Sequence, residues 1–241
     1  MRGDTKLTDA LDLLSKNKNN KAEYLLPKII RKQFKNSFLT FSTNDAILDK
    51  ISSNAIFLTE KEIAQGIVFP QDFLNKKNQM ILGSNFFIGE GIFGLSENEK
   101  NNLNLNEKEL ELIKPYYTTE QIHLYYSNPQ NKLWLIYTGS YFKNPNSMNS
   151  YPNLKRHLDR FSAVITSDNK PYGLHRAREE RFFKGEKIIA LRKCVGRPSF
   201  SYSDFDCYVS ATFYVIQTNR INLKYLTGLL NSKLVAFWLK N

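Results

Sequence analysis

Two aspartates and a lysine in the second half of the chain are the residues best suited to metal-dependent chemistry. Asp159 ends a basic segment, and Asp168-Asn169-Lys170 follows an apolar run at 163–166. Clustered carboxylates beside a lysine can hold a divalent metal and support phosphodiester cleavage. The polar string SDNKPYG around Asp168 is equally typical of a turn. A nuclease centre and a surface turn are therefore both open at this stage.

A second candidate is the glycine string at 87–91, FIGEG. It fits the F-x-G-x-G pattern of a turn that binds S-adenosylmethionine. Such a turn works because a strand leads into it and a helix leaves it directly, so that the helix N-terminus faces the ligand. Here the next helix-capping pattern, at 96–99, begins five residues after the last glycine. The acidic residues Glu107, Glu109 and Glu111 fall inside an expected helix, where they could not hold a ribose. We interpret the glycines as an ordinary turn.

Other catalytic patterns are missing from the sequence. Amine methylation of a flipped base uses Asp/Asn/Ser-Pro-Pro-aromatic, and only Asn128-Pro129 and Asn144-Pro145 come near it, without the second proline or the aromatic residue. The histidines share no short ligand spacing with Cys194 or Cys207, so no zinc site is expected. We therefore expect this chain to contain no catalytic residue, bound cofactor or metal.

Positive charge is concentrated in one part of the chain. The formal net charge is +11. Between residues 153 and 197, twelve lysines and arginines face five carboxylates, a net +7, and arginine outnumbers lysine seven to five. Arginine is the better forked donor to phosphates and guanine edges. This distribution favours a polyanionic partner, with a solvated basic surface as the alternative.

The elements that would position these residues can be read from capping and periodicity. Four capping patterns predict helix starts, at Thr59-x-x-Glu62, Ser96-x-x-Glu99, Asn106-x-x-Glu109 and Thr118-x-x-Gln121, the last opening a helix over 121–126. Segments rich in apolar and aromatic residues predict strands at 133–138, 187–195 and 207–218. Amphipathic helices are predicted at 153–161 and 221–240. We expect an α+β fold with a mixed sheet and an amphipathic C-terminal helix.

Composition places the chain among globular proteins of a reducing compartment. No apolar run reaches the roughly 18 residues of a membrane helix, and the first 21 residues lack the apolar core of a signal peptide. Two cysteines make no disulfide framework. We expect a cytoplasmic protein with no membrane partner. Residues 1–21 are interpreted as a linker or the tail of an upstream domain, and 22–241 as one domain.

Several stretches then carry a family resemblance through their order and spacing. They are AQGIV (64–68), GEGIFGLSENE (89–99), ELELIKPYYTTEQIHLYY (109–126), LWLIYT (133–138), YPNLKRHLDRF (151–161), KIIALRKCV (187–195), YVSATFYVI (208–216) and LKYLTGLLNSKLVAFWL (223–239). Together they resemble the C-terminal specificity domain of TaqI-like adenine-specific DNA methyltransferases, a module also found in fused type IIG restriction-modification enzymes. The resemblance covers roughly residues 55–239.

The resemblance implies a function and its partners. It implies a bacterial restriction-modification system in which this chain binds double-stranded DNA and a methyltransferase domain of the same parent protein modifies adenine. S-adenosylmethionine, and Mg²⁺ if a nuclease is fused, would be bound by the parent and not by this chain, which we expect to be monomeric. Two departures matter. Residues 118–122 are polar where the family has a charged pattern, and the catalytic half has no counterpart, so we take the chain as an excised or separately expressed fragment.

The resemblance also allows roles to be assigned. The expected base-reading residues lie in or beside loops, or at one predicted helix start: Arg176, Arg178, Arg181, Arg192, Arg197, Ser199, Tyr202, Tyr117, Thr118 and Gln121. The expected phosphate contacts are Lys155, Arg156, Arg160, Lys184, Lys187 and Lys193. For any one arginine, a salt bridge to Glu179, Glu180 or Glu186 is the alternative.

Two other functions stay open on the sequence alone. One is a stand-alone metal-dependent nuclease built around Asp159, Asp168 and Lys170. The other is a basic protein-interaction module whose charge serves only solubility. Salt dependence of binding would separate the second from a DNA-binding protein, because phosphate contacts weaken steeply as salt rises.

Overall fold

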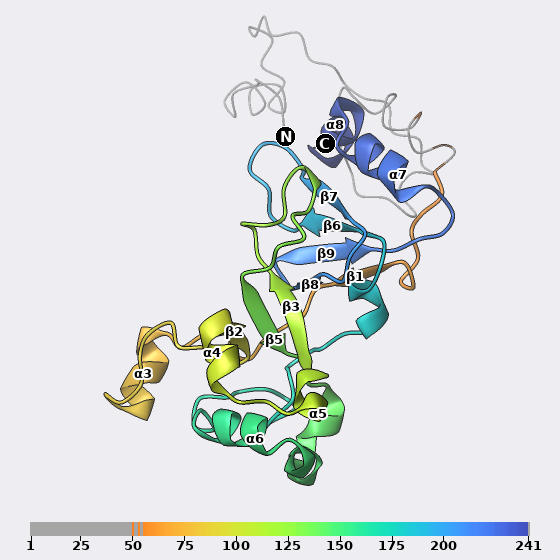
Figure 1. Ribbon diagram of the computed structural model, residues 1–241. Coiled ribbons are helices and arrows are strands. Elements are labelled where there is room, and N and C mark those ends of the chain that lie inside the picture. The colour runs from red at the N-terminus through yellow and green to blue at the C-terminus, as the bar shows by residue number, and fades with distance from the viewer. Residues whose placement is uncertain (1–49, 51–52, 54, 241) are drawn as a thin grey trace, which may run out of the picture. The chain divides into compact units, whose positions relative to one another are not determined.

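The computed structural model describes residues 50, 53 and 55–240 (Figure 1). The chain divides into two units, of which residues 58–236 form the larger. The smaller comprises residues 1–57 and 237–241, and its described residues are 50, 53, 55–57 and the end of helix α8 (Lys233–Lys240). The linker or tail expected at 1–21 lies outside the described residues.

The larger unit contains a five-stranded sheet. Its strand order is β1 (Ile63–Gln65), β9 (Phe213–Ile216), β6 (Lys187–Leu191), β7 (Phe200–Ser203) and β4 (Tyr125–Tyr126). All neighbours are antiparallel except β4 and β7, which are parallel. The central strands β6 and β9 are rich in β-branched and aromatic residues, which suit a pleated, half-buried surface.

A four-stranded sheet lies beside the point where β8 meets β9. Its order is β2 (Gly94–Ser96), β5 (Leu133–Ile136), β3 (Ile113–Tyr117) and β8 (Tyr208–Val209), with only β3 and β8 parallel. The predicted α+β fold with mixed pairing is confirmed, but there are two sheets. The strand predicted over 207–218 is broken because residues 210–212 make a turn, in which the Phe213 amide donates to the Ser210 carbonyl at 3.0 Å.

One hydrophobic core runs under both sheets. Its fully buried side chains include Phe93, Leu135, Leu158, Phe183 and Val215. Each buried side chain of this size contributes about 1.5–3 kcal/mol relative to its exposed state. A smaller cluster of Ile188, Ile216 and Leu223 joins the five-stranded sheet to helix α7 (Leu223–Leu230).

The helices near the four-stranded sheet are held by one glutamate. The predicted caps at Ser96 and Asn106 form, opening α4 (Glu97–Asn102) and α5 (Glu107–Leu110). The carboxylate of Glu109 closes the α5 capping box. It also accepts from the Asn153 and Leu154 amides, at 2.6 and 3.1 Å, at the start of α6 (Pro152–Asp159). Because α6 has no side-chain cap of its own, Glu109 satisfies the amides that its first turn leaves unpaired.

Two predicted helix starts are wrong. At Thr59 the Glu62 carboxylate accepts from the Thr59 amide at 2.9 Å, yet the chain makes a turn and enters β1. At Thr118 the Gln121 side chain accepts from the Thr118 amide at 3.0 Å, but no helix follows. Residues 125–126 pair with β7 as β4 instead. In both places strand pairing prevails over a local capping pattern.

The C-terminal helix predicted over 221–240 is two helices. Helix α7 ends at Leu230 and α8 begins at Lys233. The break is at Asn231, whose fully buried side chain accepts from the Phe200 amide at 3.0 Å and donates to the Phe200 carbonyl at 2.7 Å. This pair of hydrogen bonds fixes the end of α7 against β7. The remaining helices are α3 (Lys76–Leu82) and the 3₁₀ segments η2 (Ser140–Lys143), η3 (Pro145–Ser150) and η4 (Glu180–Phe183).

Candidate nucleic-acid interface

The segment at 66–68 forms the junction between the two sheets. The Ile67 amide donates to the Val209 carbonyl at 2.9 Å, and the Ala211 amide donates to the Ile67 carbonyl at 2.7 Å. On its other side, Val68 exchanges two backbone hydrogen bonds with Arg176, at 3.0 and 3.1 Å. At Gly66 a side chain is excluded, because a Cβ atom would lie 2.1 Å from the Ser210 carbonyl oxygen. Glycine therefore allows the two backbones to approach this closely.

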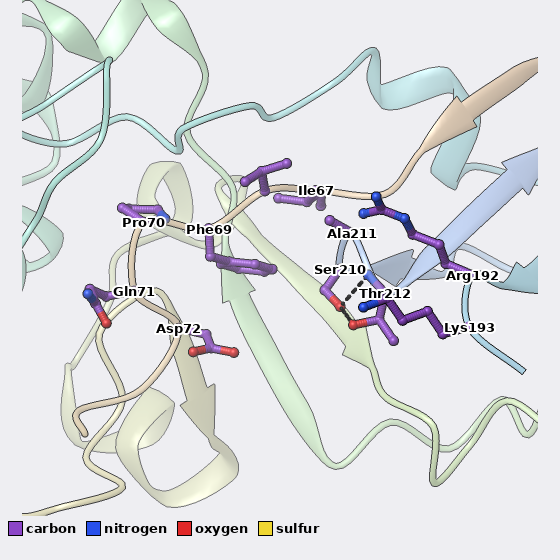
Figure 2. A pocket seen from close by; sticks show the side chains of 11 residues that line it. Ile67, Phe69, Pro70, Gln71, Asp72, Arg192, Lys193, Ser210, Ala211 and Thr212 are labelled. Atoms are coloured by element: carbon purple, nitrogen blue, oxygen red, sulfur yellow. Dashed lines mark hydrogen bonds between the residues drawn. The ribbon is translucent and has the colours of Figure 1, made fainter. Parts of the chain in front are cut away.

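An open cavity lies over this junction, and we call it the junction cavity. It is lined by three segments that are far apart in the sequence, 67–72, 192–193 and 210–212, and has a volume of about 490 Å³ (Figure 2). Arg192 and Lys193 come from the loop after β6, and both are exposed. Loops anchored to sheets in this way are typical carriers of binding residues.

Polar groups of several kinds meet in the junction cavity. The Ser210 hydroxyl donates to the Thr212 hydroxyl at 3.0 Å, and Gln71 and Asp72 approach from the opposite segment (Figure 2). The Arg192 guanidinium lies 6.0 Å from the centre of the Tyr214 ring. In the described part of the chain, neither Arg192 nor Lys193 forms an ion pair. The cavity thus offers two cations, two hydroxyls, an amide and a carboxylate, the groups that contact phosphates and base edges.

The expected phosphate contacts outside this cavity differ in their partners. Arg160 pairs with Glu90 at 2.7 Å, and the Lys184 ammonium lies 3.5 Å from a Glu180 carboxylate oxygen. On α6, Lys155 donates to Asn149 at 3.1 Å and Arg156 to Asn153 at 3.4 Å. Their ammonium and guanidinium groups are bound to neutral partners only. Lys155, Arg156 and Lys193 therefore stay predictions as phosphate contacts, whereas Arg160 and Lys184 would first have to leave a carboxylate.

The prediction that Lys187 contacts a phosphate is wrong. Its side chain is fully buried, and the ammonium donates to the carbonyls of Gly185 and Phe205, the latter at 2.6 Å. Burial lowers the pKa of Lys187 to about 8, although the acidic neighbours Cys207, Asp206 and Asp204 oppose that change. A phosphate cannot reach this ammonium while the chain is folded as described. Lys187 is the first residue of β6, a strand that is buried on both faces. Its side chain is therefore buried whichever face of the sheet it lies on.

The base-reading roles predicted for Tyr117 and Gln121, beside the expected helix start at Thr118, are also wrong. Tyr117 is 3% exposed and its hydroxyl donates to the Pro129 carbonyl at 2.8 Å. Burial raises the pKa of Tyr117 to about 12. Gln121 is 4% exposed, and its side-chain oxygen accepts from the amide and hydroxyl of Thr118. Tyr117 and Gln121 are therefore buried and take part in local hydrogen bonds, whereas Thr118 is half-buried.

The predicted base-reading arginines divide into bound and available groups. Arg178 donates to the Gln65 side chain at 2.9 Å, and Arg181 pairs with Glu179 at 2.7 Å, as the salt-bridge alternative expected. Arg197 donates to the Asn231 carbonyl at 2.6 Å and to the Tyr125 hydroxyl at 3.1 Å. Arg176 is exposed, and its backbone pairs with Val68, which lines the junction cavity, although Arg176 itself does not. Arg176 and Arg192 are therefore the arginines whose guanidinium groups have no oxygen partner in the described chain.

The two remaining predicted readers lie near β7. Ser199 is half-buried and its carbonyl accepts from the Leu191 amide at 3.1 Å. The Tyr202 hydroxyl donates to Glu186 at 2.7 Å, and burial together with this carboxylate raises the pKa of Tyr202 to about 12. Their roles in base reading stay predictions. Sequence reasoning missed Gln71 and Asp72, which follow the stretch at 64–68, and Ser210 and Thr212, which lie inside the stretch at 208–216 that was predicted to be part of a strand. The only signal in the sequence for this site was Gly66, the glycine of the motif at 64–68, because a glycine can mark a close approach of two backbones.

The glycine string at 87–91 is a turn that does not fit S-adenosylmethionine. Gly89 has φ of 89°, and the Gly91 amide already donates to Glu99 at 2.8 Å. Glu99 also closes the capping box of α4, so the amides that a cofactor would need are satisfied. Burial alone would raise the pKa of Glu99, but the hydrogen bonds from Gly91 and Ser96 outweigh it and lower that pKa.

The residues of the nuclease alternative are engaged elsewhere. Asp159 accepts from the Tyr172 hydroxyl at 2.6 Å, and an Asp168 oxygen lies 3.4 Å from His175 Nε2. Within the described ranges, no three His, Cys, Asp or Glu side chains are grouped so that they could hold a metal ion. The string around Asp168 forms turns, as one of its two interpretations predicted. No helix among the described residues is long and apolar enough to cross a membrane.

Comparison with known proteins places these features in a family. The family model described as the TaqI-like C-terminal specificity domain matches residues 96–241, more than half of the chain. No curated protein matches significantly. Among solved structures, the type IIL restriction-modification enzyme MmeI in complex with DNA has 11% sequence identity and a TM-score of 0.45, over 71% of this chain and 20% of that one. This chain thus spans about a fifth of that enzyme's length. By the family match, the chain belongs to the TaqI-like C-terminal specificity domains.

Proposed function

We propose that this chain is the DNA target-recognition module of a restriction-modification enzyme. It binds double-stranded DNA and positions it for methylation of an adenine amino group by a separate catalytic domain. The observation that carries the proposal is the match of residues 96–241 to the TaqI-like specificity domain. The motif at 64–68, which precedes the matched region, and the motif at 89–99, which overlaps its start, extend the same resemblance.

The junction cavity supports this proposal by its chemistry. Arg192 and Lys193 lie on its rim without carboxylate partners among the described residues, so both are available to phosphates or guanine edges. The hydroxyls of Ser210 and Thr212 can donate or accept, as base edges require. Arg176 adds a third cation beside the same junction. Contacts to phosphates give affinity, and contacts to base edges give sequence preference.

Catalysis belongs to the proposed parent protein. S-adenosylmethionine supplies the methyl group when it is bound to a methyltransferase domain, and a fused nuclease would use Mg²⁺. The residues of this chain then have one role, which is to fix which nucleotide of the bound DNA faces the catalytic domain. The order of motifs shared with adenine-specific enzymes supports adenine as the methylated base.

Salt dependence of DNA binding tests the proposal. Fluorescence anisotropy of a labelled duplex would be measured between 50 and 200 mM salt for the wild-type chain, Arg192→Ala/Lys193→Ala, and the control Lys76→Ala/Lys77→Ala. The control removes the same charge from exposed residues of α3. Each phosphate contact contributes about 0.9 to the slope of log affinity against log salt. We expect the slope to fall by about 1.8 in the first double variant and to stay unchanged in the control.

Two results would contradict the proposal. The first is a wild-type affinity that does not depend on salt, which would favour the protein-interaction alternative. The second is an equal loss in the two double variants, which would mean that total charge, and not the junction cavity, determines binding.

A further inference from the structure

A single carboxylate faces the junction cavity from the side opposite to its cations. Asp72 lines the cavity together with Arg192 and Lys193 (Figure 2). In the part of the chain that the structure describes, no basic side chain forms an ion pair with it. A carboxylate on a surface that binds phosphates weakens that binding by repulsion. Its presence therefore calls for a partner that offers a hydrogen-bond donor.

The backbone of Asp72 is fixed on both sides. Its carbonyl accepts from the Ile92 and Gly94 amides, each at 3.0 Å. Its Oδ1 atom accepts from the Phe73 amide at 2.9 Å. The Phe73 ring in turn lies where a side chain at position 94 would be, because a Cβ atom on Gly94 would approach the ring to 2.8 Å. The backbone is thus fixed and Oδ1 has a hydrogen-bond donor, while no hydrogen bond to the Oδ2 atom is found within the described chain.

A carboxylate accepts hydrogen bonds and donates none when ionised. In the major groove of duplex DNA, donors come from the amino groups of cytosine and adenine, and Asp or Glu accepts most often from cytosine N4. The guanine paired with that cytosine presents two acceptors, O6 and N7, which match Arg192 across the cavity. A carboxylate and a guanidinium at one cavity therefore match the donor and the acceptors that a C·G pair presents on its major-groove edge.

We propose that Asp72 is a specificity-determining residue that accepts a hydrogen bond from the N4 amino group of a cytosine in the target sequence. This inference rests on the proposed function. It predicts an unusual pair of effects for a variant that keeps the shape and loses the charge. Asp72→Asn keeps the Oδ1 acceptor for the Phe73 amide, so the loop is retained. Its affinity for unrelated duplexes rises because repulsion of phosphates is removed, while its preference at one base pair falls.

Selection from a random duplex library tests the inference. The whole chain would be used as wild type, Asp72→Asn, Asp72→Ala and Glu111→Gln, and the bound duplexes sequenced. Glu111 is an exposed carboxylate at the end of α5, so its variant controls for the change of charge. We expect a C·G pair in the wild-type motif at which Asp72→Asn lowers the preference roughly tenfold, as for loss of one good base contact. All other positions keep their preference, and Glu111→Gln reproduces the wild-type motif.

The outcomes separate this inference from the proposed function. If the wild-type chain selects a motif and Asp72→Asn selects the same motif at full strength, the inference is wrong and the proposed function stands. A loss confined to an A·T pair overturns cytosine as the partner. A wild-type chain that selects no motif contradicts both. If Asp72→Ala unfolds, as judged by thermal melting, Asp72→Asn alone decides.

Discussion

The basic segment 153–197 contains two regions whose cations are treated differently by the fold. Up to residue 187, carboxylates lie beside Arg160, Arg181 and Lys184, and Lys187 is buried against backbone carbonyls. From residue 192 onward, Arg192 and Lys193 have no carboxylate partner among the described residues. The two regions look alike in sequence, but the cations that line the junction cavity belong to the second.

The difference between the two regions concerns which cations are available to DNA more than how stable each region is. An exposed ion pair contributes about 0–1 kcal/mol to folding, so the pairs of the first region are not its main support. Each pair nevertheless has to open before its cation can reach a phosphate. A net charge of +7 in the segment therefore overstates the charge that DNA could meet.

The largest expected effect tests what holds the first region together. Replacing Glu109 with alanine leaves the amides of Asn106, Asn153 and Leu154 without their shared acceptor. A buried donor without a partner costs about 1–3 kcal/mol. We expect a loss of about 3 kcal/mol or more in the free energy of unfolding, measured by urea denaturation. A loss below about 1 kcal/mol would mean that Glu109 does not link α5 to α6.

The same carboxylate gives a pH dependence. Burial alone would raise the pKa of Glu109, but the hydrogen bonds from Asn106, Asn153 and Leu154 outweigh burial and lower that pKa below 4.5. A lowered pKa means that the stabilisation is present above pH 4.5 and is lost as the pH falls through the folded-state value. The acid side of the stability curve should therefore flatten in Glu109→Gln relative to the wild type.

A matched pair of arginines sharpens the comparison next. Arg176 and Arg181 are both exposed, but Arg181 pairs with Glu179 and stacks over Phe182, 4.0 Å from the ring centre. We expect Arg176→Ala to weaken DNA binding roughly tenfold, the usual worth of one good arginine contact. Arg181→Ala should change affinity by less than about twofold. Equal losses in anisotropy titrations would show that a carboxylate partner does not determine which arginines are available to DNA.

A smaller effect is expected at Lys187. In Lys187→Met the carbonyls of Gly185 and Phe205 lose their donor, and the free energy of unfolding should fall by about 1 kcal/mol. The affinity for DNA and its salt dependence should stay at the wild-type level despite the lost positive charge. A decrease in the salt slope by about 0.9 would show that this ammonium does reach a phosphate.

Lys187 also predicts a change on the alkaline side. Its folded-state pKa of about 8 lies below the ordinary value of 10.5. Between these values the unfolded chain binds more protons than the folded chain, so the stability of the wild type should rise from pH 8 to pH 10.5. Thermal melting of the wild type and Lys187→Met over this range should show the rise in the wild type alone.

Sequence patterns predicted the longer elements and missed the short ones. Strands at 133–138 and 187–195 and the helix at 153–161 have enough residues for a period to be visible, and the structure contains all three. Strands of two or three residues, such as β4 and β8, show no period, and their pairing depends on distant neighbours. The similar capping patterns Asn106-x-x-Glu109 and Thr118-x-x-Gln121 led to a helix in one case and a turn in the other, because tertiary contacts decide between these outcomes.

The candidate site was predictable only in its charge. The positive charge of Arg192 and Lys193 is evident from composition, but both were predicted inside the strand 187–195, which ends at Leu191 in the structure. Gln71 and Asp72 lie about 120 residues earlier in the chain, and Ser210 and Thr212 interrupt what reads as a continuous strand. Their meeting depends on the backbone pairing of Ile67 with Val209 and Ala211, which no local pattern encodes.

The tight approach of Gly66 to Ser210 has a consequence for how such a module could change over time. Since the floor beneath the cavity is locked by main-chain atoms, side chains around its mouth can be exchanged without disturbing the scaffold. New sequence preferences could then arise by substituting a handful of outward-facing groups, one nucleotide preference after another. Gly66 itself would tolerate no such replacement. We therefore expect the residue beneath the cavity to stay constant while the residues around its mouth vary.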